Sequence, residues 1–566
     1  MRSPDELKRL AEVEGIVAAT ATLELSDYKD EALIGAIAAG GSRRNILISD
    51  RDLEILGSVS GTRFFGVQTI LCEVIPRLDA SSDDIIRLVS TLVEKGGDDM
   101  AANRPNAAFR QWCETDLERA DAVIAAARGG DDEAMRHVVF ALEAKGDAEE
   151  AFRCTQADGP QRTAGILALS RVSLDSDEAQ RAVALIAKMA TTATPAEAAG
   201  MLHAAYDVAA KHNDLDRTEL VDALRARSDK AAPEVVHLMA TALYRHAAKM
   251  TPEEFDLCAT GLLAIDPTNI GTVNEIDGAL REIWKTRPGD ATRLAASLIE
   301  RTEGRISQDD LDRFYHAVGN GDPQAMARLA TSWLLNANIH VCATLHSLLS
   351  EINRTEPHFA VDPVDLPETA EEQVFLCRKA IGYLILSPMT AAAWIVAVLR
   401  GGHPDAKAQA ADLLFEPLLV NFGGALKDWL ERIVNHDAPG RSAIQHALDR
   451  ARELQNGIEA AGEVVELEPS THRRAQVQFM EAEEQEQVRE RAQAMSIFAG
   501  MVTTQNLLYG DRSSFRVSDK DGRRHSQTTH MASMTVQTEL PKGLIFDPIG
   551  FERMLDVLRR EVRTKS

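Results

Sequence analysis

The chain has 566 residues, which is too many for one compact core, so its length predicts several domains or one extended repeat array. A hydrophobic content of 45% excludes wholesale disorder. The scattered cysteines form no CxxC pair, which excludes a disulfide scaffold or a zinc-finger array and favours a reducing compartment. They are Cys72, Cys113, Cys154, Cys258, Cys342 and Cys377.

Charge is distributed unevenly along the chain. The formal net charge is −25, and residues 501–566 hold 11 basic and 8 acidic side chains, a net of +3. The remaining 51 basic and 79 acidic side chains therefore give residues 1–500 a net charge of −28. Nucleic-acid binding depends on neutralising phosphates with Lys and Arg, so nucleic acid is an unlikely partner for the bulk of the chain.

Several helix starts can be identified directly. Ser3, Thr194 and Thr251 are each followed by proline and, three residues on, by glutamate. This pattern predicts a hydroxyl N-cap, proline at N1 and a capping box. The opening stretch MRSPDELKRL has no apolar run of the kind a secretory signal needs, so we expect a cytoplasmic protein.

The spacing of helix starts predicts a helical repeat. From Asp177 to Asp322 most starts lie 15 to 22 residues apart, with further starts at Asp216, Pro233, Asp290 and Ser307. Each interval fits a helix of three to four turns and a short loop. Two helices per unit give a repeat of roughly 35 to 45 residues, the period at which α-solenoids are expected.

A weak self-similarity supports this reading. Segments such as DDEAMRHVVFALEAKG at 131 and DPQAMARLATSWLL at 322 run from an acid or proline through a basic or polar residue into a helix of small residues and leucine. They resemble HEAT repeats, whose helices often open on an Asp-Pro-x-x-Arg-like turn. The arginine's place is taken by Arg136, Arg162, Arg181, Arg293 and Arg328, and by Lys407 in the last copy. The resemblance implies a curved stack of helix pairs whose faces bind other proteins.

The helical pattern is interrupted at residues 356–368 and again after residue 460, and we interpret both places as domain borders. We expect an α-solenoid over residues 1–355, a proline-rich connection over 356–368 and further helical repeats over 369–460. Ala380 to Leu399 is twenty residues without a charge, long enough for a membrane helix. Because Ser387-Pro388 divides it, we interpret it as two buried helices and expect no membrane span.

The C-terminal part has a different pattern. A long charged helix is predicted over residues 461–510, and a β-hairpin with a capping helix over 511–566. Phe515 and Val517 alternate with polar residues before an Asp-Lys-Asp-Gly turn, and Met534 to Leu540 alternate again. Asp547-Pro548 begins a final helix with one apolar face, formed by Phe551, Met554, Leu555, Leu558 and Val562. The predicted fold class is therefore mainly α: a HEAT-like α-solenoid of antiparallel helix pairs with a small C-terminal β-hairpin plus helix module.

No motif for nucleophilic catalysis, phosphate binding or calcium binding is found, so no catalytic residue or cofactor is predicted. Cys342 and His346 are four residues apart and would share a helix face, as half of a metal site requires. We prefer the other interpretation, in which both side chains fill a buried interface between helices. His525 and His530 differ by five, so a regular strand points them to opposite faces and a metal pair there is improbable.

A basic cluster in the predicted hairpin is the candidate partner-binding site. It consists of Arg512, Arg516, Lys520, Arg523, Arg524 and His525. It is either a solvated turn that discourages strand aggregation or a patch for an acidic partner, including the chain's own acidic body. We expect a non-enzymatic scaffold or adaptor that binds a protein partner along the acidic solenoid. Two alternatives stay open. One is a nucleic-acid-binding solenoid that contacts its ligand through the basic module. The other is a catalytic or regulatory subunit, for example the regulatory subunit of a larger enzyme or defence complex, in which distant residues such as His340, His346 and Asp362 converge.

Overall fold

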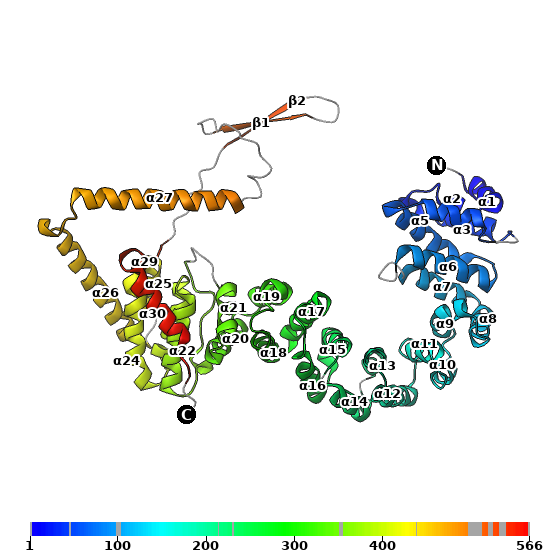
Figure 1. Ribbon diagram of the computed structural model, residues 1–566, viewed down its shortest axis with the longest axis horizontal. Coiled ribbons are helices and arrows are strands. Elements are labelled where there is room, and N and C mark those ends of the chain that lie inside the picture. Colours follow the sequence, from blue (N-terminus) through cyan, green and yellow to red (C-terminus); the bar gives the residue numbers. More distant parts are fainter. Residues whose placement is uncertain are drawn as a thin grey trace. The chain divides into compact units, whose positions relative to one another are not determined.

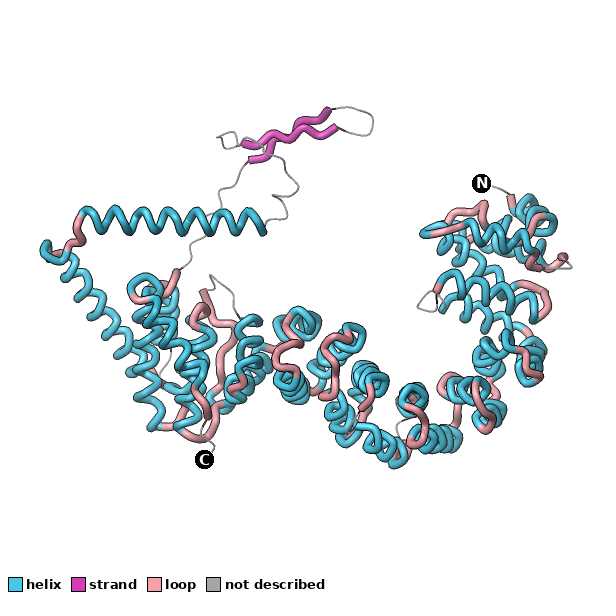
Figure 2. The backbone as a smooth tube through the Cα atoms, viewed as in Figure 1, coloured by secondary structure: helices cyan, strands magenta, loops and turns pink. Residues whose placement is uncertain are grey.

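The computed structural model describes residues 3–44, 47–97, 103–212, 214–228, 231–349, 355–436, 439–495, 512–518, 524–530 and 539–563. The described chain is mainly helical, which confirms the predicted class (Figure 1, Figure 2). It divides into two compact units. Unit 1 comprises Met1–Arg301 with Asp310–Phe314, and unit 2 comprises Thr302–Asp309 with Tyr315–Ser566. The proline-rich connection at 356–368 lies inside unit 2.

Unit 1 consists of helices joined by short loops. They are α1 (Pro4–Val13), α2 (Ile16–Thr20), η1 (Leu25–Lys29), α3 (Glu31–Gly41), α4 (Asp50–Ser58), α5 (Gly61–Val74), η2 (Ile75–Arg77), α6 (Ser82–Gly96), α7 (Asn103–Thr115), α8 (Leu117–Arg128), α9 (Asp132–Lys145), α10 (Ala148–Thr155), α11 (Pro160–Leu169), α12 (Ser176–Ala190), α13 (Pro195–Ala209), α14 (Thr218–Ser228), α15 (Pro233–His246), η4 (Ala247–Lys249), α16 (Pro252–Leu262), α17 (Ile270–Thr286) and α18 (Pro288–Arg301). η5 (Asp309–Leu311) and α19 (Asp312–Gly319) follow at the border between the units.

These helices pack as pairs and as two rows. α12 packs on α13, and α15 packs on both α16 and α17. Along one row α11, α13, α15 and α17 contact each other in turn, while α12, α14 and α16 do so along the other. The apolar stripe of each helix is therefore covered by its pair mate and by the next helix of its row. In α6, for example, Ile85, Leu88, Val89 and Leu92 are buried.

Several hydrogen bonds between helices join residues that are 37 apart in the sequence. In unit 1 the Arg217 guanidinium contacts the Glu254 carboxylate 37 residues later, and Asp277 accepts from the backbone N–H of Phe314, again 37 residues later. In unit 2 His346 contacts the carbonyl of Tyr383 at the same separation. Each contact joins one helix pair to the next.

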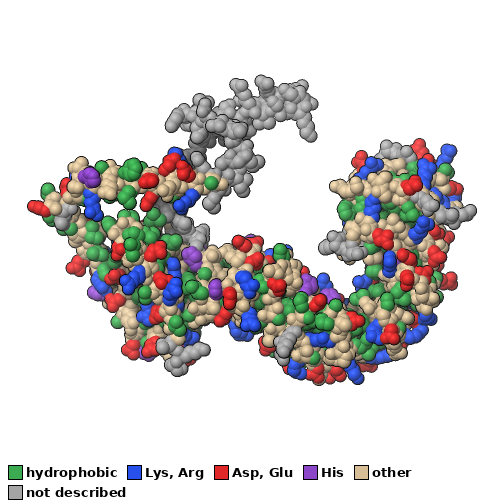
Figure 3. Space-filling model, viewed as in Figure 1, with side chains coloured by type: hydrophobic (Ala, Val, Ile, Leu, Met, Phe, Trp, Pro, Cys, Tyr) green, Lys and Arg blue, Asp and Glu red, His purple; other side chains and the backbone are tan. Residues whose placement is uncertain are grey.

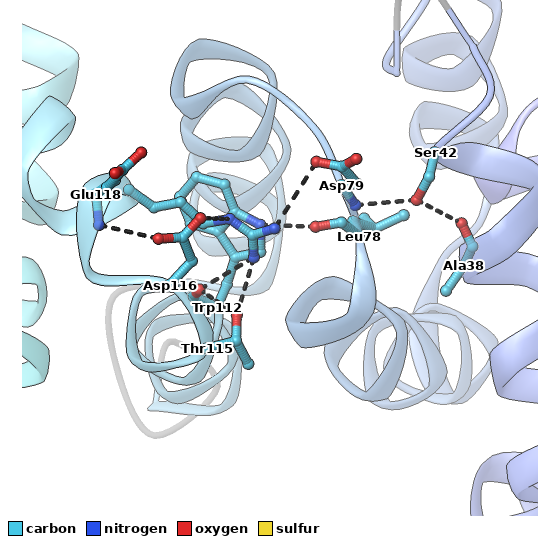
Figure 4. A network of polar contacts seen from close by, with 9 residues as sticks. Ala38, Ser42, Leu78, Asp79, Trp112, Thr115, Asp116 and Glu118 are labelled. Atoms are coloured by element: carbon cyan, nitrogen blue, oxygen red, sulfur yellow. Dashed lines mark hydrogen bonds and ion pairs between the residues drawn. The ribbon is translucent and has the colours of Figure 1, made fainter.

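The N-terminal part of unit 1 contains the same connection (Figure 4). The backbone N–H of Asp79 donates to Ser42 Oγ at 2.9 Å, 37 residues earlier, and Ser42 Oγ donates to the carbonyl of Ala38. Trp112 Nε1 donates to the carbonyl of Leu78 at 2.9 Å across 34 residues. The short segment Leu78–Asp79 is thus hydrogen-bonded to the end of α3 on one side and to α7 on the other.

The predicted capping boxes are confirmed. Ser3, Thr194 and Thr251 each accept from the backbone N–H three residues on, and the glutamate there accepts from the cap's own N–H. Asp322 is the N-cap of α20, also as expected. The start predicted at Ser307 is wrong by a few residues, because the chain forms a 3₁₀ turn at Asp309–Leu311 before α19 begins.

Unit 2 contains the remaining elements. They are α20 (Pro323–Asn336), α21 (Ile339–Leu349), η6 (Pro363–Asp365), α22 (Ala370–Leu384), α23 (Pro388–Gly401), α24 (Pro404–Leu413), η7 (Leu414–Leu419), α25 (Ala425–His436), α26 (Arg441–Gly462), η8 (Val465–Leu467), α27 (Thr471–Met495), β1 (Arg512–Ser518), β2 (Arg524–His530), α29 (Lys542–Phe546) and α30 (Pro548–Arg560).

The rows of unit 2 enclose the uncharged segment. α20, α22, α24 and α26 contact each other in turn, and α23 packs on α25. The segment Ala380–Leu399 is divided at Ser387-Pro388 between α22 and α23, and nearly all its side chains are buried, as predicted. In the part of the chain that the structure describes, no helix combines the length and the apolar character needed to cross a membrane.

The two strands pair in antiparallel register. Arg512 lies opposite His530, Arg516 opposite Ser526 and Ser518 opposite Arg524. The described partner of β1 is β2, Arg524–His530. Met534 and Val536 of the predicted second strand lie outside the described residues.

Candidate protein-binding surface

The last described helix of the chain lies against α22 (Figure 1). Asp547 Oδ1 accepts from the backbone N–H of Gly550 at 2.9 Å, and Pro548 occupies the first turn, so α30 begins where the sequence predicts. Phe551 and Leu555, four residues apart, are buried, and Met554 and Leu558 beside them are half-buried. Val562, predicted to share this face, lies past the end of the helix and is 83% exposed.

Gly382 permits a close approach between the two backbones. A Cβ at this position would lie 3.1 Å from Leu558 Cβ and 3.2 Å from the Arg559 nitrogen. Any side chain here would therefore press on α30. The glycine is the point on α22 at which the final helix can come closest.

One cation of α22 contacts the C-terminal end of α30, and one cation of α30 contacts α22 in return. Lys379 is completely buried, and its Nζ donates to the carbonyl of Arg559 at 2.5 Å. Burial lowers the pKa of Lys379 from its ordinary value. The last carbonyls of a helix carry partial negative charge and lack intrahelical donors, so an ammonium there is favourably placed. In the reverse direction, Arg559 Nε donates to the carbonyl of Gly382 at 2.6 Å, and its guanidinium lies 5.9 Å from the centre of the Tyr383 ring.

The residue after the helix is held by a forked ion pair. Arg378 Nε and Nη2 donate to the Glu561 carboxylate at 2.6 to 3.1 Å. Arg563 pairs with Glu372, which lies six residues before Arg378 on α22. A cleft of about 950 Å³ opens beside these pairs, bordered also by Phe375, Asp405 and Gln409. We call Arg378, Lys379, Gly382 and Tyr383 the α22 docking surface.

A second anchor holds the segment before α30. The Glu539 carboxylate accepts from the backbone N–H groups of Gly424 and Ala425, at 2.7 and 3.1 Å, and so caps the start of α25. The side chain of Asn421 accepts from the backbone N–H of Gly543 at 2.7 Å. Residues 539–563 thus form a strap between the start of α25 and α22.

The predicted basic cluster is not part of the α22 docking surface, and two of its residues lie outside the described residues. Arg512 and Arg516 fall in β1, and Arg524 and His525 fall in β2. Lys520 and Arg523 lie outside the described residues. His525 pairs with Val517 and His530 with Arg512, so the two histidines occupy positions of opposite parity in the ladder, as their odd spacing predicts.

Cys342 and His346 do not share a partner, because each side chain contacts a different backbone carbonyl. Cys342 is buried, its Sγ donates to the carbonyl of Trp333 at 3.4 Å, and burial raises its pKa to about 12. His346 Nδ1 lies 2.6 Å from the carbonyl of Tyr383. Across the described residues no group of three potential ligands could hold a metal ion. These contacts agree with the buried-interface interpretation.

The three residues considered for a convergent site have different neighbours. The His340 ring lies against Gly304, His346 contacts the Tyr383 carbonyl, and Asp362 accepts from the backbone N–H of Val364 in η6. No contact among the three is found in the part of the chain that the structure describes.

Unit 1 contains a second polar group between α6 and α9. Ser90 Oγ lies 2.9 Å from both His137 Nε2 and the Glu133 carboxylate, beside an acidic cleft of about 350 Å³ that also includes Asp83, Glu94 and Asp131. A catalytic serine–histidine pair needs a third group to orient the histidine. His137 Nδ1 is buried and has no such partner among the described residues, so the geometry is that of a helix-to-helix contact.

Sequence reasoning missed the α22 docking surface. Its one signal was the pair Arg378-Lys379, directly before twenty uncharged residues. Adjacent cations at the edge of a buried helix need partners, but the pattern does not say which segment supplies them.

Comparison with known proteins gives no relative to guide interpretation: no protein-family model matches the chain, and no curated protein matches it.

Proposed function

We propose that the chain is a HEAT-like α-solenoid that acts as a protein-binding adaptor, and that the α22 docking surface receives a helical segment of its partner. The two rows of helices and the recurrence of contacts about every 37 residues support the solenoid reading. The observation that carries the functional part is the docking of α30, because the chain presents one of its own helices to this surface.

The docked helix defines what the surface recognises. It buries two apolar side chains four residues apart, offers its last carbonyls to Lys379 and places a carboxylate opposite Arg378. This is the helix-in-groove mode of recognition, in which apolar anchors provide affinity and polar contacts at one end fix the direction. A partner helix would carry the same features in the same order. No nucleophile, cofactor or metal is needed for this role.

The surface charges on the visible face give the protein little further means of distinguishing one partner from another. Acidic and basic side chains are interspersed over the face shown in Figure 3. The proposed partner is recognised by the local pattern of anchors and polar contacts around α22.

The test uses a variant of the full chain with its strap released. Phe551→Asp combined with Leu555→Asp places charges where apolar side chains are buried, so α30 should leave α22. A fluorescent peptide covering residues 539–563 should then bind to this variant and not to the wild-type chain, as measured by anisotropy. Adding Arg378→Ala should weaken peptide binding at least tenfold.

The matched control peptide has serine at both anchor positions and should not bind. A released chain that keeps the wild-type helical signal yet fails to bind the first peptide would contradict the proposal. A partner captured from the native host by the released chain should be displaced by the first peptide and not by the control.

A further inference from the structure

The last long helix of the repeat rows is covered over only half of its length. In α26, Ile444, Ala447 and Leu448 are buried against unit 2. Beyond them Ala451 is half-buried, Leu454 is 39% exposed and Ile458 is 52% exposed. No residue from Arg452 to Gly462 is buried. The helix therefore extends past the helices that pack against it.

The apolar seam of α26 does not stop where the cover stops. Ile444, Ala451 and Ile458 are seven residues apart, and Ala447, Leu454 and Ala461 form the second series of the same seam. This is the heptad spacing with which one helix packs along another. The covered and exposed parts are one continuous surface, so the exposed part has the character of a helix–helix interface.

Charged residues avoid the exposed half of the seam. Arg452, Glu453 and Glu459 lie on the opposite side of the helix by heptad position. The positions flanking the seam are Gln455, Gly457 and Gly462. Flanks without charge or bulk allow another helix to approach closely.

The sizes of the exposed seam residues are symmetric along the helix. The order is Ala451, Leu454, Ile458 and Ala461: small, large, large, small. In an antiparallel pair of identical helices, Leu454 of one copy faces Ile458 of the other, and Ala451 faces Ala461. A two-fold axis makes the same patch complementary to itself, which is the requirement for an isologous dimer interface.

We infer that the distal half of α26 is the interface at which two copies of this chain associate, antiparallel and two-fold symmetric. The exposed half has about three helical turns and is therefore roughly 20 Å long. An interface this short is smaller than those of permanent dimers, so association depends on protein concentration. A dimer would present two α22 docking surfaces, which raises avidity for a partner with two helices. The inference does not depend on the proposed function, since either one can fail alone.

Sedimentation of the full chain over a wide concentration series tests association. The expected result is a rise in average mass toward twice that of the chain. Replacing Leu454 and Ile458 with serine should abolish the rise without unfolding the protein, because both side chains are already partly exposed. Ile270→Ser, at a 72% exposed position in unit 1, is the matched control and should still dimerise.

Cysteine cross-linking tests the orientation. Near the two-fold axis of the antiparallel pair, Gln455 of one copy lies beside Gln455 of the other, while Asn456 points away from the seam. Gln455→Cys should therefore form a disulfide-linked dimer under mild oxidation, and Asn456→Cys should not. The six native cysteines are buried and should not interfere. A chain that stays monomeric at every concentration, or equal cross-linking of the two variants, would overturn the inference.

Discussion

Lys249 Nζ donates a hydrogen bond of 2.5 Å to the carbonyl of Ala210, 39 residues earlier. Lys211 makes the equivalent bond to Ser170, and Arg287 makes it to Met250. The three donors follow one another at intervals of 38 residues, and each lies at the end of one helix and contacts the end of the preceding helix in its row. A cation there satisfies carbonyls that the helix cannot pair itself. Unit 1 thus contains a ladder of cationic caps.

Removing one cation of this ladder should destabilise unit 1. Lys249→Met keeps the length of the side chain but leaves the Ala210 carbonyl without its donor. The expected loss in free energy of unfolding is about 1 kcal/mol, measured by urea denaturation. Lys249→Arg keeps a donor within reach and should lose much less. If the two variants unfold alike, the bond has no role in stability.

The buried His137 should make unit 1 sensitive to acid. Burial lowers its pKa from 6.5 to about 4, so the unfolded chain takes up a proton more readily than the folded chain. Because the folded chain holds His137 neutral, this residue causes no loss in the free energy of unfolding above pH 6.5. The loss then grows as the pH falls toward 4. At pH 5 the loss from this group is about 2 kcal/mol.

Comparison with His137→Gln isolates this effect from other groups that titrate. The variant is expected to be less stable than the wild type at pH 7.5, with the difference shrinking by about 2 kcal/mol at pH 5. Urea denaturation at the two pH values measures it. A difference that does not change with pH would exclude His137 as the origin of acid sensitivity.

Gly15→Ala should be among the most damaging small substitutions in unit 1. Gly15 has a φ of +115°, which side-chain-bearing residues rarely adopt, and a Cβ there would overlap the fully buried Asp52 carboxylate. We expect a loss of about 2 kcal/mol or more, seen as a lower unfolding midpoint. Gly35→Ala, in α3 where a Cβ meets nothing within 4 Å, is the control and should be neutral or slightly stabilising.

Gly382→Leu should release α30 from α22 without altering α30 itself. The new side chain would occupy the space of Leu558 and the adjacent backbone. Trypsin should then cleave after Arg553 sooner than in the wild type, because local opening exposes the backbone to the protease. Gly35→Leu should leave this cleavage rate unchanged, and an equal rate in Gly382→Leu would contradict the close contact.

Local features of the fold could be predicted from the sequence because their causes lie within a few residues. The capping box at Thr251 and Glu254 needs only three residues, and Ser387-Pro388 breaks a helix wherever it occurs. The predicted repeat length rests on the distances between such starts and stays a prediction. The cationic ladder did not, because Lys211, Lys249 and Arg287 have no common motif around them.

The candidate site could not be predicted because its parts are far apart in the chain. Arg378 and Glu561 are separated by 183 residues, and Lys379 and Arg559 by 180. The apolar face of α30 could be identified, but its periodicity does not specify the surface that covers it.

The same separation has a consequence for synthesis on the ribosome. Contacts between helix pairs in unit 1 join residues about 37 apart, so each pair can dock soon after the next has emerged. Lys379 and Gly382 must wait for about 180 further residues before α30 covers them. During this interval, which lasts on the order of 10 to 40 seconds at common elongation rates, nascent unit 2 has an uncovered α22 docking surface that a chaperone or an early partner can bind.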